Sequence, residues 1–317
     1  MELGVPLIPL RGQSANKAGG GHLRIVIFQT LRMNSQEVRL RKIHAFVKKM
    51  PSLSTTVSKV LEICSRTDTA PNDLNKVISL DPVLTGQVLK LINSAYYSLV
   101  NKVTSLTRAI IMLGLNTVKN LALSTAIIRS VGQTKKSKVL PIQKFWAHSI
   151  GVGVTAKIFA AELDIPLGER EEFFVAGLLH DLGKIPFDDE YATVLAKTKE
   201  RRQPLITMEE ELLGVDHQEV GRLIAQKWKL NSGITQAICF HHCPEQADPE
   251  LRQLVAAVAL ADCYVCLFDI GYAGNVYPDE EKFQQALEMT GLSWETISGL
   301  SEVVEEEIHK AEIFLQV

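Results

Sequence analysis

The sequence predicts an all-α protein made of two helical subdomains, and three observations support this prediction. From about Ser35 onward, apolar residues recur at the three- and four-residue spacing of helices that bury one face. Helix starts separate these segments, as at Asp81-Pro82, where an N-cap carboxylate precedes a proline in the first turn. The chain has 317 residues and is 46% hydrophobic and 22% charged, which suffices for one large or two modest cores.

The first helical subdomain is predicted over residues 36–138. Its clearest helix begins at Asp81 and carries a broad apolar face. Ser105 and Thr107 are both candidate caps for a later helix that ends at Gly114, where a glycine is typical of a helix C-terminus. The helices predicted around it cover residues 53–64, 72–78 and 116–127.

Two changes in composition mark the predicted boundaries. The polar stretch 134–138, followed by Pro141, is typical of a linker and begins the second subdomain at residues 139–317. Residues 1–35 contain a glycine cluster and form a predicted extension that is flexible or partly ordered. Within it, the apolar residues 23–31 fit a short strand or an added helix, and we assign the extension no function.

The bulk properties exclude several classes of function. A formal net charge of −2 gives no argument for nucleic acid as the main partner. Five cysteines without a secretory signal are typical of reduced thiols, so we expect a cytoplasmic protein. No apolar run reaches the roughly 18 residues of a membrane-spanning helix, so we expect no insertion into a membrane.

The second subdomain contains the sequence Ala176 to Ile185, an apolar run that leads into His180-Asp181 and Lys184. A carboxylate beside an imidazole is costly to bury without a partner. One explanation is a simple hydrogen-bonded pair of side chains. The other is a metal ion, because imidazole and carboxylate together suit zinc, iron or manganese.

Other potential ligands stand in similar apolar or helix-end settings along the same half. A helix predicted over 142–163 carries His148 and then the small residues Gly151, Gly153 and Ala156, which would let another helix approach closely. Five of the eight histidines fall between positions 148 and 242. The further candidate ligands are His217, His241, His242 and Asp262.

One metal ion is predicted to lie at Asp181 and Asp262. Asp181 and Asp262 lie in apolar segments, and a cation would compensate both charges if they are buried. Asp181 can also bridge to a second ion, an arrangement that supports in-line attack on a phosphoester. The second ion would be held by Asp181, His217, His241 and His242.

Residues 148–262 resemble the HD superfamily of metal-dependent phosphohydrolases, through His148, His180-Asp181 and Asp262. The additional histidines, with Lys184, resemble its two-metal branch, which includes the HD-GYP phosphodiesterases. Over residues 40–265 the order of segments is more similar to the HDOD family. In that family a helical half, here containing Asp81-Pro82-Val83-Leu84, precedes the HD-like bundle.

The resemblance implies a signalling or regulatory module that binds one or two divalent transition-metal ions, which would be iron, manganese or zinc. It implies that the first ion is held by His148, His180, Asp181 and Asp262. It also implies a protein partner in a signalling pathway and a possible nucleotide ligand. The alternative is a phosphohydrolase that acts on a nucleotide or cyclic nucleotide, with metal-activated water as nucleophile, Asp181 as the bridge and Lys184 steadying the phosphate charge. Where HD-GYP proteins have Gly-Tyr-Pro, this chain has Cys243-Pro244-Glu245, which argues against hydrolysis of cyclic dinucleotides.

Three other patterns have simpler explanations. Gly177 to Lys184 has the wrong glycine spacing for a phosphate-binding loop. Asp216 can orient His217 or cap a helix, and both roles stay open. Four cysteines fit a zinc site or, more simply, a helical core: Cys239, Cys243, Cys263 and Cys266.

Overall fold

The structure is a computed structural model in which every regular element of the described part of the chain is a helix, so the all-α prediction is confirmed. The described residues are 37–316, with gaps at 51–52, 54, 67, 133–138 and 278. The predicted extension over residues 1–35 lies outside them. The chain divides into two units, residues 1–42 and 43–317. In the first unit, residues 37–42 are helical.

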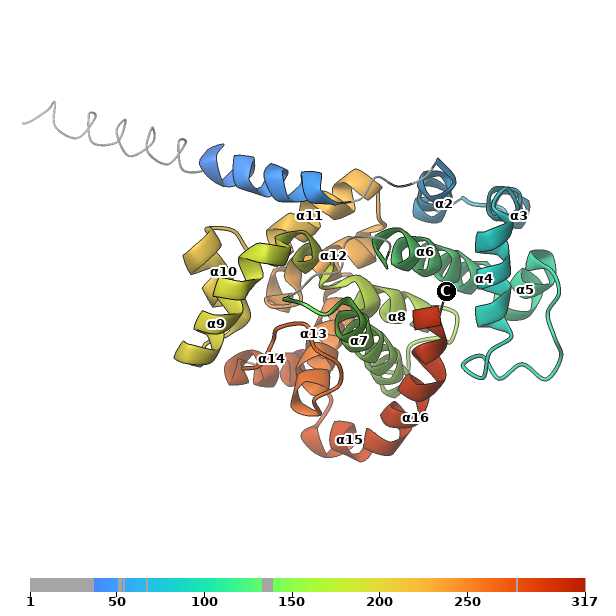
Figure 1. Ribbon diagram of the computed structural model, residues 1–317. Helices are drawn as coiled ribbons and strands as arrows, with labels where there is room; N and C mark the ends of the chain where they lie inside the picture. Colours follow the sequence, from blue (N-terminus) through green and yellow to red (C-terminus); the bar gives the residue numbers. More distant parts are fainter. Residues whose placement is uncertain are drawn as a thin grey trace, which may run out of the picture. The chain divides into compact units, whose positions relative to one another are not determined.

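The second unit begins with helical residues 43–49 and continues with two groups of helices (Figure 1). The first group is α2 (Thr55–Ser65), α3 (Pro71–Ser79), α4 (Pro82–Ile92), α5 (Leu106–Leu113) and α6 (Leu115–Gly132). The second group opens with α7 (Ile142–Glu162), α8 (Arg170–Leu179), the 3₁₀ helix η1 (Leu182–Glu190), α9 (Tyr191–Arg201) and α10 (Leu205–Leu213). It continues with α11 (His217–Trp228), α12 (Ser232–Phe240), η2 (Pro244–Gln246), α13 (Arg252–Leu267), α14 (Glu280–Thr290), α15 (Trp294–Gly299), α16 (Ser301–Ala311) and η3 (Glu312–Gln316).

The helices of the first group begin and end where the sequence signals stand. The Asp81 carboxylate accepts hydrogen bonds from the backbone N–H groups of Val83 and Leu84, both at 3.0 Å, and so caps α4. Ser105, rather than Thr107, caps α5. Gly114 ends α5 with a φ of +83°, a conformation that favours glycine.

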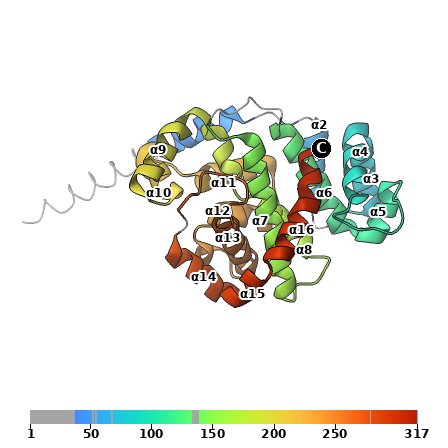
Figure 2. The ribbon, with the colours of Figure 1, turned by 60° about the horizontal axis from the view of Figure 1, so that its bottom comes forward.

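In the second group, α7 packs along α8 and α13, and Figure 2 shows these helices together in the middle of the bundle. The helices α7 and α8 cross with their backbones in contact, as the run of small residues predicts. A Cβ atom on Gly177 would lie 2.8 Å from Cα of Gly153, so neither position has room for a side chain. This crossing places His148 of α7 near the end of α8.

One hydrophobic cluster includes buried residues from both groups, from Ile43 to Phe314. A second cluster surrounds α13 and contains Phe159, Tyr264 and Ile297. The subdomain boundary at residues 138–139 stays a prediction. Within the described residues, no helix is both long enough and apolar enough to span a bilayer.

Candidate metal centre

Four of the predicted ligands meet where α7, α8 and α13 come together. His148 lies on α7 and Asp262 on α13, while His180 and Asp181 directly follow α8. All four residues are buried, with at most 4% of the surface of any of them exposed. The ring centroids of His148 and His180 are 5.6 Å apart, as the close crossing of α7 and α8 requires.

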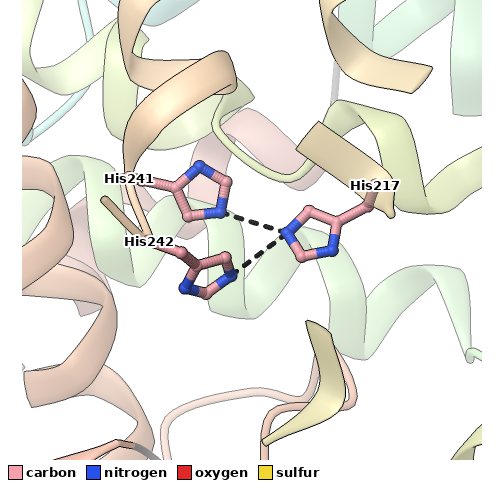
Figure 3. A group of neighbouring side chains, drawn as sticks. All are labelled: His217, His241 and His242. Carbon is pink, nitrogen blue, oxygen red and sulfur yellow. Dashed lines mark hydrogen bonds between the residues drawn. The ribbon is translucent and has the colours of Figure 1, made fainter. Parts of the chain in front are cut away.

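The remaining histidines come from α11 and the end of α12. His217 is the first residue of α11, and His241 and His242 directly follow α12. Figure 3 shows their rings turned toward one another: Nε2 of His217 lies 3.2 Å from Nε2 of His241 and 3.1 Å from Nε2 of His242. This approach depends on Gly183 in η1, because a Cβ atom there would overlap the carbonyl oxygen of His217.

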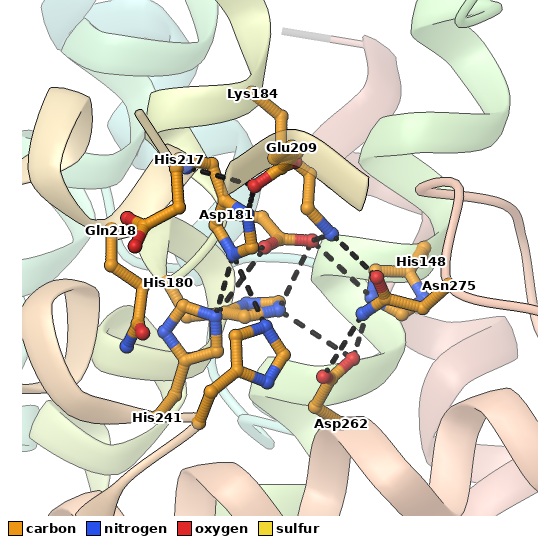
Figure 4. A network of polar contacts seen from close by, with 12 residues as sticks. His148, His180, Asp181, Lys184, Glu209, His217, Gln218, His241, Asp262 and Asn275 are labelled. Atoms are coloured by element: carbon orange, nitrogen blue, oxygen red, sulfur yellow. Dashed lines mark hydrogen bonds and ion pairs between the residues drawn. The ribbon is translucent and has the colours of Figure 1, made fainter. Parts of the chain in front are cut away.

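The seven predicted ligands therefore form two neighbouring groups, with Asp181 between them. Figure 4 labels six of the seven, and His242 is labelled in Figure 3. In the first group, Oδ1 of Asp262 lies 3.0 Å from Nε2 of His148 and 3.6 Å from Nε2 of His180. Oδ2 of Asp181 lies 3.3 Å from Nε2 of His180. Oδ1 of Asp181 lies 3.5 Å from Nε2 of His217, so its two oxygens face different groups.

These separations fit metal coordination. Two nitrogen ligands of one zinc ion, each about 2.1 Å from it, lie about 3–4 Å apart. In each group the potential ligand atoms all lie within 4.8 Å of one another. Imidazole and carboxylate donors suit zinc, iron and manganese. The donor set thus fits one ion per group.

Hydrogen bonds on the far side of three rings determine which nitrogen faces the centre. Each of these Nδ1 atoms lies against an oxygen that can only accept, so Nδ1 carries the proton and donates it. The acceptors are the Gly177 carbonyl for His180 (2.6 Å), the Ala237 carbonyl for His241 (2.9 Å) and the Glu209 carboxylate for His217 (2.6 Å).

In each of these rings, when neutral, Nε2 then holds a lone pair that points into the centre. The 3.2 Å contact between Nε2 of His217 and Nε2 of His241 joins two lone pairs. It is a hydrogen bond only if an extra proton is present, whereas a metal ion between the rings satisfies both nitrogens.

Three polar atoms of the centre are buried and have no hydrogen-bond partner among the described residues. They are Nε2 of His148, Nε2 of His180 and Oδ1 of Asp181. Leaving one buried polar atom unpaired costs about 1–3 kcal/mol. The two nitrogens face the first group and Oδ1 of Asp181 faces the second, so a cation in each group would satisfy all three atoms.

The pKa values of the histidines in the centre are consistent with metal ligands. Burial lowers the pKa of His180, but the carboxylates of Asp181 and Asp262 outweigh burial and raise that pKa to about 10. Burial, reinforced by nearby cationic groups, holds the pKa of His217 and His242 well below the usual range. The second group is therefore neutral and ready to bind a metal, while a proton on His180 is what an ion in the first group displaces.

Glu209, a buried residue of α10, was not expected at the site from the sequence. Its Oε2 accepts from the backbone N–H of His217 at 2.9 Å as well as from the ring, and its Oε1 accepts from the Tyr191 hydroxyl. A carboxylate behind a ligating histidine fixes the ring and raises its basicity. The acidic run Glu209-Glu210-Glu211 was the available signal, but it does not show which carboxylate is buried.

Lys184, the last predicted site residue, is 1% exposed and lies beside the centre. Its Nζ donates to Oδ2 of Asp181 at 2.6 Å and to Oδ1 of Asn275 at 3.1 Å. The ammonium group is therefore an ion-pair partner of the carboxylate that lies between the two groups. Its contact with a substrate phosphate stays a prediction.

The structure also decides two alternatives that the sequence left open. The Asp216 carboxylate accepts from the backbone N–H of Glu219 at 2.8 Å and so caps α11, while Glu209 orients His217. The four cysteines are free thiols, and none belongs to a metal-ligand group of the described residues: Cys239, Cys243, Cys263 and Cys266.

A cavity of about 250 Å³ adjoins the centre. Its lining includes His241, His242 and Asp262 on one side and the first turn of α10 on another. Lys282 of α14 also lines the cavity, and its ammonium group donates to the carbonyl oxygen of His242. A small molecule can thus reach ligands of both groups from this cavity.

Fold and site together define an all-α protein with a candidate two-metal centre of histidine and aspartate. The chain belongs to the HDOD family, since the HDOD domain matches residues 50–244. The family identified from the sequence is thereby confirmed. Asp262 lies beyond the matched residues, and the fold alone places it in the centre.

Two solved structures are similar over most of their length. An HDOD domain protein from Geobacter sulfurreducens is 28% identical, covers 87% of this chain and 97% of its own, and superposes with a TM-score of 0.70. A protein from Shewanella amazonensis SB2B, provisionally described as a phosphohydrolase, is 25% identical. It covers 87% of this chain and 97% of its own, with a TM-score of 0.66.

Two curated proteins match parts of the chain. An uncharacterised protein of Treponema pallidum is 26% identical over 254 residues, which are 78% of this chain and 48% of that protein. Ribonuclease Y of Enterococcus faecalis is 35% identical over 112 residues, which are 35% of this chain and 16% of that enzyme. The chain thus spans about half or less of the curated relatives that it matches.

Proposed function

We propose that this chain is an HDOD-type regulatory module that binds two divalent transition-metal ions in its second helical group. The observation that carries the proposal is a set of buried nitrogen and oxygen atoms that face one another, three of them without a hydrogen bond among the described residues. Three imidazoles are held by their Nδ1 atoms with Nε2 directed inward, and Asp181 offers one oxygen to each group.

The proposed first site consists of His148, His180, Asp181 and Asp262. The proposed second site consists of Asp181, His217, His241 and His242. The donor set suits iron, manganese or zinc. In a regulatory module the ions stabilise the bundle and tie its helices together, because binding an ion only in the folded state favours folding.

Membership in the HDOD family supports the regulatory reading, in which the partner is another protein of a signalling pathway. The charge balance, at −2 overall, gives no support for nucleic acid as that partner. The match to ribonuclease Y covers too little of that enzyme to transfer its substrate to this chain.

The second candidate function is hydrolysis of a phosphoester, and the cavity favours it. A regulatory metal site has no need of an adjoining cavity, whereas this one brings a ligand to His241, His242 and Asp262. When bound, two ions supply Lewis-acid and nucleophile-generating chemistry. Lys282 and the first turn of α10, which has no side-chain cap, line the cavity, and the N-terminus of a helix favours an anion. At about 250 Å³ the cavity lies just below the size usual for drug-sized ligands, which favours a mononucleotide-sized compound.

One paired measurement separates the two functions. The purified protein is analysed for iron, manganese and zinc, and is assayed with bis(p-nitrophenyl) phosphate, a generic phosphodiester, plus added manganese or iron. The variants are His180→Ala and His217→Ala. His309→Ala is the matched control, because that side chain is 82% exposed.

The regulatory proposal expects bound metal in the wild type and the control, partial loss in each site variant, and no hydrolysis. Hydrolysis that disappears in His180→Ala but persists in His309→Ala establishes the phosphohydrolase instead. A wild-type protein that takes up no metal under any loading condition contradicts both functions.

A further inference from the structure

The segment that follows α13, residues 268–277, returns over the candidate metal centre. The backbone N–H of Tyr272 donates to the carbonyl oxygen of Lys144 on α7 at 2.9 Å. Gly271 has a φ of +69°, and a Cβ atom there would overlap the backbone of His148. The segment is thus packed directly against the helix that supplies the first ligand.

Asn275, in this segment, is bonded to two charged groups of the centre (Figure 4). Its Oδ1 accepts from Nζ of Lys184 at 3.1 Å, and its Nδ2 donates to Oδ2 of Asp262 at 3.2 Å. The orientation of the amide is unambiguous, because the flipped amide would turn N–H groups toward an ammonium and an oxygen toward a carboxylate.

These hydrogen bonds determine which oxygens of Asp262 and Asp181 face the histidines of the centre. Asn275 engages Oδ2 of Asp262, which leaves Oδ1 facing Nε2 of His148 at 3.0 Å. Through Lys184, the same amide also supports Asp181, whose Oδ2 accepts from Nζ at 2.6 Å. One side chain therefore restrains carboxylates from two different elements.

Asn275 also forms part of the wall between two cavities. The cavity of about 250 Å³ lies on the side of His241 and His242, and another of about 390 Å³ lies on the side of His148. Asn275 and Cys266 line both cavities. The amide group of Asn275 thus lies at the edge of the centre, where it lines both cavities.

We propose that Asn275 is a positioning residue of the metal centre. It holds Asp262 so that Oδ1 alone binds the ion of the first site, and it keeps Lys184 on Asp181. The proposal rests on the metal sites of the proposed function. A carboxylate freed from this amide can rotate or bind with both oxygens, and loss of such an outer partner typically weakens metal affinity about 10–100-fold.

The test is a titration of the metal-free chain with Zn²⁺ against a chromophoric chelator. His148→Ala and His217→Ala identify which binding step belongs to which site. Asn275→Leu removes both hydrogen bonds at nearly constant volume, and Asn275→Ala is a second, smaller variant in case leucine perturbs folding. Asn72→Leu, at an exposed position of α3, is the control for the same change elsewhere.

The expected result is first-site affinity about 10–100-fold weaker in both Asn275 variants, with second-site affinity close to wild type. The Tm of the metal-free protein should fall only modestly, because two hydrogen bonds to buried charged groups are lost. Unchanged binding at both sites overturns the inference and leaves the proposed function intact. Equal weakening at both sites with a lower metal-free Tm also overturns it, because that is the behaviour of a residue that only supports the fold. A wild-type chain that binds no Zn²⁺ overturns the proposed function and this inference together.

Discussion

The two ends of α8 carry buried charged clusters that differ in one respect. At its start, Glu171 is 3% exposed and belongs to a cluster that the protein completes by itself. At its end, His180 and Asp181 belong to a cluster that retains unpaired atoms. Both clusters are buried and charged, so burial of charge alone does not identify a ligand site.

The cluster around Glu171 accounts for both of its carboxylate oxygens. Oε1 accepts from the Tyr97 hydroxyl at 2.6 Å and Oε2 accepts from Nζ of Lys157 at 2.7 Å. The ammonium group lies 4.6 Å from the ring centroid of Tyr96. Burial and the Glu171 carboxylate raise the pKa of Tyr97 well above its usual range, so its hydroxyl stays a donor. This cluster joins the two groups of helices and needs no further partner.

The cluster around Asp181 has more donors and acceptors than its members can pair. Nitrogen lone pairs face each other, and three buried atoms are left without hydrogen bonds among the described residues. This difference between the clusters is the evidence for a bound ligand. It predicts that metal changes the stability contributed by the cluster around Asp181 and leaves that of the cluster around Glu171 unchanged.

The largest effect is expected from Gly183→Ala, which should break the incomplete cluster. The added Cβ atom would overlap the carbonyl oxygen of His217, and neither backbone can move without separating η1 from α11. We expect a loss of about 3 kcal/mol or more in the free energy of unfolding, measured by chemical denaturation, together with loss of the second metal.

Gly86→Ala is the matched control, because nothing lies within 4 Å of the position on α4 where its Cβ would stand. There alanine should stabilise the protein by about 0.5–1 kcal/mol. A Gly183→Ala protein as stable as the wild type would contradict the close packing described for the centre.

Glu171→Leu tests the complete cluster. It removes the acceptor of Tyr97 and the partner of Lys157, whose side chain is 24% exposed and retains some access to water. We expect the free energy of unfolding to fall by about 2–3 kcal/mol. The fall should be the same with metal and with chelator, whereas His180→Ala should abolish part of the stabilisation by metal. A metal-dependent effect of Glu171→Leu would show that the two clusters are not separate.

Glu209→Gln should weaken the second metal site selectively. An amide can still accept from His217, but it cannot carry the charge that makes the ring basic. Burial raises the pKa of Glu209 to about 7, so the comparison is made above pH 7, where the wild-type carboxylate is ionised. We expect about 10–100-fold lower affinity for the second ion in a metal titration. Glu211→Gln is the control, since that carboxylate pairs with Arg201 at the surface. If the two variants bound the second ion with equal affinity, Glu209 would have no role in metal binding.

The smallest effect belongs to Asp81, a capping residue outside both clusters. Asp81→Ala should destabilise the protein by about 1 kcal/mol at neutral pH, since it removes the cap of α4. The Leu84 backbone N–H lowers the pKa of Asp81 below its ordinary 3.8, burial opposes this, and Arg129 adds to the lowering.

The sign of the pH dependence follows. The folded-state pKa is depressed, so the contribution is complete well above pH 3.8 and is lost as the pH falls through 3.8 toward the folded value. Denaturation of wild type and variant should therefore converge in acid. A difference that does not shrink as the pH falls below 3.8 would contradict the role of the ionised cap.

The sequence predicted what short-range patterns encode. Helix ends were predicted correctly from Asp81-Pro82, Ser105 and Gly114. The close crossing of α7 with another helix was predicted from the small residues of α7. The seven candidate ligands stood out because histidine and aspartate are conspicuous in apolar segments, and the structure brings their side chains together.

What the sequence could not supply depends on contacts between distant residues. Glu209 lies in a run of three glutamates, and only the packing of α10 shows which one is buried behind His217. Asn275 lies 13 positions after Asp262 in an irregular segment, so no periodicity marks it. Glu171 and Tyr97 are 74 positions apart, and their pairing appears only in the folded chain.

The central claim is that the incomplete cluster holds two metal ions. The most direct measurement is an anomalous difference map from crystals of the metal-loaded protein, collected at the absorption edge of that metal. The account predicts two peaks, one among His148, His180 and Asp262, the other among His217, His241 and His242, with Asp181 in contact with both. A fully loaded crystal with no peak at either position would contradict it.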